Sequence, residues 1–212
     1  RARSAMDYRY GPALRDRVAG NLAKFTPRAH AATGLKRAAV AITLVADAAG
    51  EAAYALTRRS PRLNKHAAQW ALPGGRVDAG ETAIAGALRE LAEEVELHLD
   101  AGAVLGVLDD YPTKSGYVIT PVVVWAGADA EMRANPDEVA SIHRIGLREL
   151  DRPDSPVFFD IPESARPVIR ILIGDQTLHA PTAAMVYQFR EVAVHGRRQR
   201  VDHLGEPVWA WR

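Results

Sequence analysis

Three glutamates lie within five residues of one another in the sequence GRVDAGETAIAGALRELAEEVEL, which covers residues 75–97. Glu90 and Glu94 are four residues apart and Glu93 follows Glu90 by three, so a helix would carry all three carboxylates on one side. Carboxylates gathered in this way repel one another unless solvent or a cation offsets their charge. Mg²⁺ takes oxygen ligands and is typically shared between a few carboxylates and the phosphates of a substrate. The spacing therefore indicates either a magnesium site or a solvated acidic helix face.

The residues around these glutamates favour the functional interpretation. Arg89 can orient a carboxylate through a charged hydrogen bond, and Glu81, about two helical turns earlier, is a candidate ion-pair partner for Arg89. Pro73, Gly74 and Gly75 lie immediately upstream, and glycine backbone can approach a ligand closely because no side chain intervenes. We therefore expect the glycine-rich turn and the acidic helix to form one site.

The segment resembles the Nudix box, G-x5-E-x7-R-E-U-x-E-E-x-G-U, in which U is an aliphatic residue. Gly75, Glu81 and the run Arg89–Glu94 fall in register, and eight of the nine specified positions match over 23 residues. The departure is Glu96, which stands where the pattern has a glycine that helps to end the helix, often with positive φ. A non-glycine residue in that geometry costs on the order of 1 kcal/mol, or the helix ends differently.

That resemblance implies a fold, a reaction and a set of ligands. The fold would be α/β, an α/β/α sandwich around a mixed β-sheet. The reaction would be the hydrolysis of a diphosphate linked to another moiety, with Mg²⁺ or Mn²⁺ as the cofactor. The metal ligands would be Glu90, Glu93, Glu94 and the backbone carbonyl of Gly75.

The resemblance also implies catalytic and supporting roles. Arg89 would orient a carboxylate, Glu81 would brace Arg89, and Gly74 would support the turn. Glu90 or Glu93 would accept the proton of the attacking water, unless a base from the later loops does so.

A second resemblance lies upstream, in ALTRRSPRLNKHAAQWALPGG, residues 55–75. It is similar to the additional signature of the coenzyme A diphosphatase branch, L-L-T-x-R-S-x3-R-x3-G-x3-F-P-G-G. That branch cleaves CoA or acyl-CoA to 3′,5′-ADP and 4′-phosphopantetheine, so a CoA-like substrate is implied. The positions in register are Leu56, Thr57, Arg59, Ser60, Pro73, Gly74 and Gly75, and the departures are Ala55, Asn64, Ala68 and Leu72. Residues 116–124, 135–139 and 182–183 also resemble the branch.

Cations are dense in this upstream segment. Within nine positions it holds Arg58, Arg59, Arg62, Lys65 and His66. Several cations suit CoA, which carries a diphosphate and a 3′-phosphate, whereas the alternative is a solvated basic loop. The predicted substrate-binding residues are Arg59, Ser60, His66 and Arg58, and Arg59 is the first choice because it matches the signature.

Histidines and tryptophans elsewhere receive structural interpretations. His179, His195 and His203 lack the spacing of partners in a site, and we expect structural or surface positions for them. Trp209 and Trp211 are expected to pack on the domain, with stacking on adenine as the alternative.

Two other functions remain open. The first is a Nudix hydrolase that acts on ADP-ribose, NADH or another nucleoside diphosphate derivative, which Asn64 and Ala68 favour. The second is a non-catalytic module that senses a nucleotide. Such a module would be expected to lose ligand carboxylates, and this sequence keeps all three.

Composition bounds the remaining classes. The 212 residues are 48 % hydrophobic and 25 % charged, which is globular, and a net charge of +1 gives no bulk electrostatic case for a nucleic acid polymer or a membrane surface. The absence of cysteine excludes disulfides, zinc thiolate sites and cysteine nucleophiles. No apolar run reaches the roughly 18 residues that span a bilayer, and no secretory signal is apparent, so we expect a cytoplasmic protein. The sequence does not determine the oligomeric state.

The predicted elements form one domain with an extension. Residues 1–35 would be an N-terminal helical extension, with a helix at 13–25, and residues 36–212 the Nudix hydrolase domain. Helices are also expected at 81–95, 147–150 and 181–194. Strands are expected at 36–47, 52–60 (a hairpin with the first), 102–112, 117–127, 138–146 and 167–174, with a short extended piece at 70–75 and a proline-rich loop at 153–162.

Overall fold

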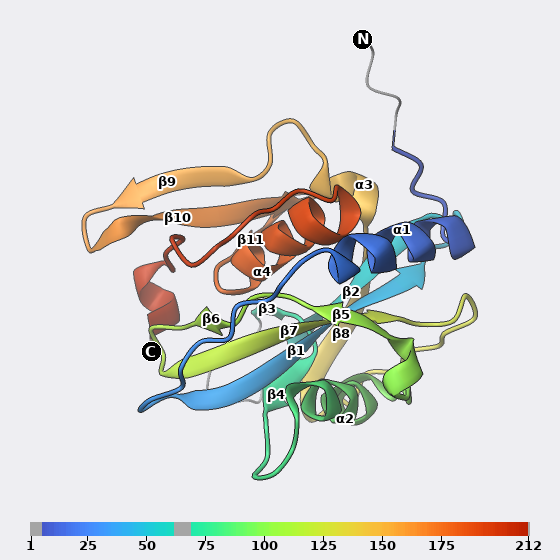
Figure 1. The fold of residues 1–212 in the computed structure, drawn as a ribbon, viewed down its shortest axis with the longest axis horizontal. Coiled ribbons are helices and arrows are strands. Elements are labelled where there is room, and N and C mark those ends of the chain that lie inside the picture. The colour runs from blue at the N-terminus through green and yellow to red at the C-terminus, as the bar shows by residue number, and fades with distance from the viewer. Residues whose placement is uncertain (1–5, 62–68, 212) are drawn as a thin grey trace.

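A mixed sheet forms the centre of the protein in a computed structural model that describes residues 6–61 and 69–211. Strands β3, β2, β1, β7 and β5 lie side by side in that order, and β4 pairs with β1, β6 with β7 and β8 with β2 (Figure 1). The bounds are β1 Lys36–Ala46, β2 Ala52–Arg59, β3 Trp70–Ala71, β4 Gly74–Arg76, β5 Val104–Val107, β6 Tyr111–Pro112, β7 Tyr117–Trp125 and β8 Val139–Gly146.

The direction of the strands makes the sheet mixed. β1 and β7 run parallel, in a register that extends from Lys36 opposite Tyr117 to Leu44 opposite Trp125. The other pairings in the sheet are antiparallel, and β1 and β2 form the predicted hairpin. The prediction of an α/β fold around a mixed sheet is therefore confirmed.

Helices cover both faces of this sheet because β1 is apolar on both sides. Its alternate residues Ala39 and Ala41 are buried against α2 (Ala83–Val95), where their small side chains let the helix approach closely. Ile42 and Leu44 face the opposite side, where α1 (Pro12–Ala23) and α4 (Thr182–Phe189) share a second core (Figure 1). The catalytic candidates of α2 thus lie on one face, and the N-terminal and C-terminal helices lie on the other.

The N-terminal helix belongs to the packed core. Leu14, Val18 and Leu22 of α1 are buried, and α1 packs against the C-terminal extension of α4, a π-helical turn at Arg190–Val194. The division into residues 1–35 and 36–212 stays a prediction.

A second, three-stranded sheet corrects the prediction of an irregular loop at 153–162. Strand β9 (Val157–Ile161) lies inside that range and pairs with β10 (Ser164–Ile173), which pairs in turn with β11 (Gln176–His179). Val157, Phe158 and Phe159 supply the residue types that favour a strand. β9 is an edge strand, and prolines that flank an edge strand remove no hydrogen bond from the sheet. The prolines at 153–162 therefore do not exclude a strand there.

The remaining short elements connect these layers. The predicted helix at 147–150 is present as α3 (Leu147–Leu150), and short 3₁₀ turns occur at Ala101–Ala103 and Val208–Trp211. In the described part of the chain, no helix combines the length and the apolar character that crossing a bilayer requires.

Candidate active site

Helix α2 presents the three glutamates, and both of its ends have clear local causes. At its start the Thr82 hydroxyl accepts a hydrogen bond from the Ala85 N–H at 3.1 Å, which caps the first turn. Leu91 and Val95 are fully buried and hold the helix against the sheet. The helix ends at Glu96 with φ 53° and ψ 28°, so this residue keeps the left-handed geometry that usually belongs to glycine.

The glycine pair of β4 lies directly against this helix. A Cβ atom on Gly75 would come within 2.3 Å of the Glu90 Oε1 atom, and one on Gly74 would come within 2.3 Å of the Ala39 carbonyl oxygen. Both glycines are therefore required by close approach, of a carboxylate in the first case and of the neighbouring strand in the second.

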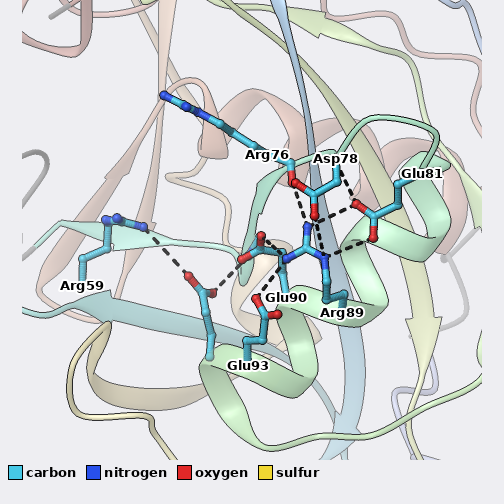
Figure 2. Close-up of polar contacts among 9 residues, drawn as sticks. Arg59, Arg76, Asp78, Glu81, Arg89, Glu90 and Glu93 are labelled. Carbon is cyan, nitrogen blue, oxygen red and sulfur yellow. Dashed lines mark hydrogen bonds and ion pairs between the residues drawn. The ribbon is translucent and has the colours of Figure 1, made fainter.

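Arg89 lies among the carboxylates: it hydrogen-bonds three of them and has its Nε atom 3.9 Å from Oδ2 of a fourth, Asp78 (Figure 2). Its Nε and Nη2 atoms donate to the two carboxylate oxygens of Glu81 at 3.1 and 3.2 Å, so the predicted ion pair is present and bidentate. Its Nη1 atom donates to Glu90 Oε1 and to Glu93 Oε2, each at 2.9 Å. A further bond to the carbonyl of Arg76, at 2.8 Å, ties the helix to β4.

Glu94 occupies a different environment, because it is 3 % exposed. Burial raises the pKa of its carboxyl to about 7, a hydrogen bond from the Gly74 N–H at 3.1 Å opposes the rise, and the charge of Glu90 adds to it. The Arg59 Nη1 atom is 4.0 Å from Glu94 Oε1. The buried carboxylate thus has incomplete compensation for its charge.

The charge of Glu90 is also incompletely compensated, to a smaller degree than that of Glu94. Burial raises its pKa, Arg89 opposes the rise, and the charges of Glu93 and Glu138 add to it. Glu93 is more open, with a side chain that is 51 % exposed. The site therefore combines one buried carboxylate, one largely buried carboxylate and one half-exposed carboxylate, with more negative charge than its two arginines offset.

The donor set fits a hard divalent cation. The candidate ligands are carboxylate oxygens and a backbone carbonyl, which Mg²⁺ and Mn²⁺ prefer, and the buried negative charge of Glu90 and Glu94 calls for a cation. Within residues 6–61 and 69–211, however, no three acidic or histidine side chains already converge on one point. Arg89 holds Glu90 and Glu93 in this structure, and the Gly74 N–H holds Glu94.

The predicted substrate-binding residues divide into three groups. Arg59 lies beside Glu94, as described above. Ser60 is buried and its N–H donates to the carbonyl of Glu138 at 2.8 Å, while Arg58 lies over the ring of Trp70, 5.1 Å from its centre. His66 lies outside the described residues, as do Arg62, Asn64, Lys65 and Ala68.

Glu138 is a site residue that the sequence did not single out. Its charge raises the pKa of both Glu90 and Glu94, so its carboxylate belongs to the same electrostatic cluster. The loop that carries it is bound to α2 through Asn135, whose N–H donates to the carbonyl of Glu94 at 2.9 Å. The resemblance of residues 135–139 to the CoA branch was the signal that could have found it.

A cavity of about 460 Å³ adjoins the carboxylates on the side of Arg59. Trp70, Tyr117, His179 and Trp209 line it together with Arg59. His179 was expected at a structural or surface position and Trp209 in packing against the domain. Their spacing in the sequence gives no sign that they meet, because the topology alone brings β11 and the C-terminal turn to β3 and β7.

Comparisons with known proteins agree on one family of similar proteins. A model of the NUDIX domain matches residues 35–166, more than half of the chain. A protein of Klebsiella pneumoniae named uncharacterized Nudix hydrolase NudL is 45 % identical over 95 residues, which cover 44 % of this chain and 50 % of the relative. Its namesake in Citrobacter koseri is 42 % identical over 115 residues, 54 % of this chain and 59 % of the relative. The matched region thus spans about half the length of these relatives.

Among solved structures, a MutT/nudix family protein from Enterococcus faecalis superposes with a TM-score of 0.48 and 18 % sequence identity. The superposition covers 74 % of this chain and 58 % of the other.

Proposed function

This chain belongs to the Nudix family, and we propose that it is a metal-dependent diphosphohydrolase that cleaves CoA or acyl-CoA to 3′,5′-ADP and (acyl-)4′-phosphopantetheine. One observation carries the choice of substrate. Arg59 of the CoA-like signature and Glu94 of the Nudix box lie together, with Nη1 and Oε1 4.0 Å apart. A diphosphate bound at the carboxylates would therefore meet a cation that the upstream signature supplies.

Nudix hydrolases generally use divalent metal ions, and we propose Mg²⁺ or Mn²⁺ for this chain. Glu90, Glu93 and Glu94, with the carbonyl of Gly75, would hold the ion. A divalent cation in this place supplies charge neutralisation for the diphosphate and activation of water.

The protein's own groups have separate tasks in this proposal. Arg89 orients Glu90 and Glu93 through hydrogen bonds of 2.9 Å and is itself fixed by both oxygens of Glu81. The Gly74 N–H fixes Glu94. These contacts keep the three carboxylates on one side of α2 and close to β4. A divalent cation would draw their oxygens onto one point, which they do not reach in the described residues of this structure.

A carboxylate must accept the proton of the attacking water. Glu90 and Glu93 are candidates from the helix, and Glu138 is the candidate that a later loop contributes. The raised pKa of Glu90 makes it a stronger base than an exposed glutamate.

A substrate panel tests this proposal. Purified protein with Mg²⁺, and separately with Mn²⁺, is incubated with CoA, acetyl-CoA, ADP-ribose, NADH and a diadenosine polyphosphate, and the products are separated by chromatography. We expect 3′,5′-ADP from CoA and acetyl-CoA at a kcat/KM at least tenfold above that for any other compound. Release of AMP from ADP-ribose or NADH with CoA left intact would replace CoA by another nucleoside diphosphate derivative. No turnover with either metal would favour the non-catalytic, nucleotide-sensing module.

A further inference from the structure

We propose that the cavity beside Arg59 binds the nucleobase of the diphosphate substrate, with the indole of Trp209 as its stacking surface. The identification of that base as adenine rests on the proposed function. The cavity has a volume of about 460 Å³, within the range of small-molecule pockets in proteins. It lies between the main sheet and the C-terminal elements, because β3 and β7 form one wall and β11 and the turn at Val208–Trp211 form the other.

Two residues of the cavity wall link the cavity to the carboxylate site. Arg59 lines the cavity and also has its Nη1 atom 4.0 Å from Glu94 Oε1. Tyr117 lines the cavity, and its hydroxyl accepts hydrogen bonds from Nε and Nη2 of Arg76 at 3.1 and 3.0 Å. The carbonyl of Arg76 in turn accepts a bond from Arg89. A substrate whose diphosphate lies at Glu94 can therefore place one of its substituents in this cavity.

The walls suit a neutral, planar group. Arg59 carries the one permanent charge among the described residues that line the cavity, and it lies at the end toward the carboxylates. The other walls combine the aromatic rings of Trp70, Tyr117 and Trp209 with hydroxyl groups such as that of Thr182. Aromatic walls with a few neutral polar groups bind heteroaromatic rings by stacking and hydrogen bonding. The charged phosphates would remain at the Arg59 end.

Trp209 has the exposure and the support that a stacking surface needs. It is 48 % exposed, which leaves indole surface for a stacked ring to cover. Its ring is 5.2 Å from that of His179, with an angle of 87° between the two planes, so one neighbour already restrains the indole. Aromatic side chains stack on any nucleobase, because every base has a flat π-face.

His179 adds hydrogen-bonding capacity to the same wall. Burial lowers its pKa, with a further contribution from the charge of Arg170, so the imidazole is neutral at pH 7. A neutral imidazole has one donor and one acceptor nitrogen, which matches the mixed donors and acceptors on the edge of a base.

Binding of the two reaction products separates this inference from the proposed function. Isothermal titration in buffer with Mg²⁺ would measure the Kd of 3′,5′-ADP, AMP and 4′-phosphopantetheine for the wild type, Trp209→Ala and Trp209→Phe. Val208→Ala is the matched control, because Val208 is the adjacent exposed residue and does not line the cavity. Because Trp209→Ala removes the stacking surface, we expect it to raise the Kd of 3′,5′-ADP and of AMP about tenfold or more. We expect 4′-phosphopantetheine to stay within twofold, Trp209→Phe to restore most of the affinity, and Val208→Ala to match the wild type.

Any other result of this titration would overturn the inference. If Trp209→Ala weakens the binding of 4′-phosphopantetheine and leaves the binding of the nucleotides unchanged, the cavity holds the pantetheine arm. Equal weakening of all three compounds, no change in any, or no binding of either nucleotide by the wild type also contradicts a base-binding cavity. Failure of the proposed function is visible separately: a wild type that binds AMP through Trp209 but leaves CoA intact keeps the inference and loses CoA as the substrate.

Discussion

The carboxylates of the Nudix box are chemically unequal although they lie within five residues. Glu93 is half exposed, whereas burial raises the pKa of Glu90 and takes that of Glu94 to about 7. The sequence predicted the cluster, since helical spacing alone places the three on one side. It did not predict that Glu94, in the last turn of the helix, is buried against Gly74, because that burial depends on how β4 packs against the helix.

Glu96 offers a stability test at the scale of one residue. It holds φ 53°, a conformation that costs a non-glycine residue about 1 to 2 kcal/mol. Glu96→Gly should raise the free energy of unfolding by about 0.5 to 1 kcal/mol, after allowance for the greater freedom of glycine in the unfolded chain. Glu96→Ala is the control, because alanine keeps the strain and should change stability by less than about 0.5 kcal/mol.

Urea denaturation of both variants measures this difference. Equal stability of Glu96→Gly and the wild type would show that the Glu96 side chain offsets the strain of its backbone.

At the scale of elements, the contact between β4 and α2 positions the site. Gly74 and Gly75 are neighbours in one strand, yet a side chain would meet different obstacles at the two positions. At Gly74 it would meet the backbone of Ala39 and Val40, and at Gly75 the end of the flexible Glu90 side chain. We therefore propose that Gly74 serves stability and that Gly75 serves the position of Glu90 in the site.

Alanine at each glycine tests that division. Gly75→Ala should displace Glu90 and lower kcat for CoA, the proposed substrate, at least tenfold, with a change in unfolding free energy of about 1 kcal/mol or less. Gly74→Ala should cost about 2 kcal/mol or more, because backbone cannot move aside as a side chain can. Paired measurements of kcat and of urea unfolding decide the matter. A Gly75→Ala enzyme with full activity would contradict the placement of Glu90 in the site.

The elements also show where sequence reasoning succeeds. The helix over 83–95 and the strands β1, β2, β7 and β8 follow from apolar periodicity, which is strong in long segments. β9 and β11 were missed because each has five residues or fewer and depends on pairing with β10. Short strands gain their stability from their neighbours, and a single sequence window does not contain those neighbours.

At the scale of the whole molecule, the C-terminal tail is tied to the turn between β6 and β7. Glu206 accepts a hydrogen bond from the Lys114 N–H at 3.0 Å, and Tyr111 donates to the carbonyl of Leu204 at 3.0 Å. These contacts bring the tail, with Trp209, to the cavity wall. No local pattern encodes an approach over some ninety residues, so the sequence revealed the carboxylates but not the cavity beside them.

Glu206 makes this connection sensitive to pH. The residue is 3 % exposed, and burial raises its pKa from 4.5 to about 7. Between these values the folded protein binds more protons than the unfolded chain, so stability falls as pH rises from about 4.5 to 7. Glu206→Gln keeps an acceptor for Lys114 and removes the charge. It should raise the unfolding free energy at pH 8 by on the order of 1 to 3 kcal/mol and leave it nearly unchanged at pH 4.5.

Urea unfolding of wild type and Glu206→Gln at a series of pH values gives this difference directly. A difference that is constant across the series would show that the Glu206 carboxyl has the same pKa in the folded and the unfolded protein, which would contradict the effect of burial.

Binding of Mn²⁺ tests the central proposal, a divalent-cation site on α2, most directly. Electron paramagnetic resonance of free Mn²⁺ would be followed as protein is added, for the wild type, Glu94→Gln and the control Glu163→Gln, whose exposed carboxylate lies between β9 and β10. We expect Glu94→Gln to bind Mn²⁺ at least tenfold more weakly than the wild type, because the buried ligand loses its charge, and Glu163→Gln to bind as the wild type does. Equal affinity of the wild type and Glu94→Gln would contradict the assignment of this carboxylate cluster as the metal site.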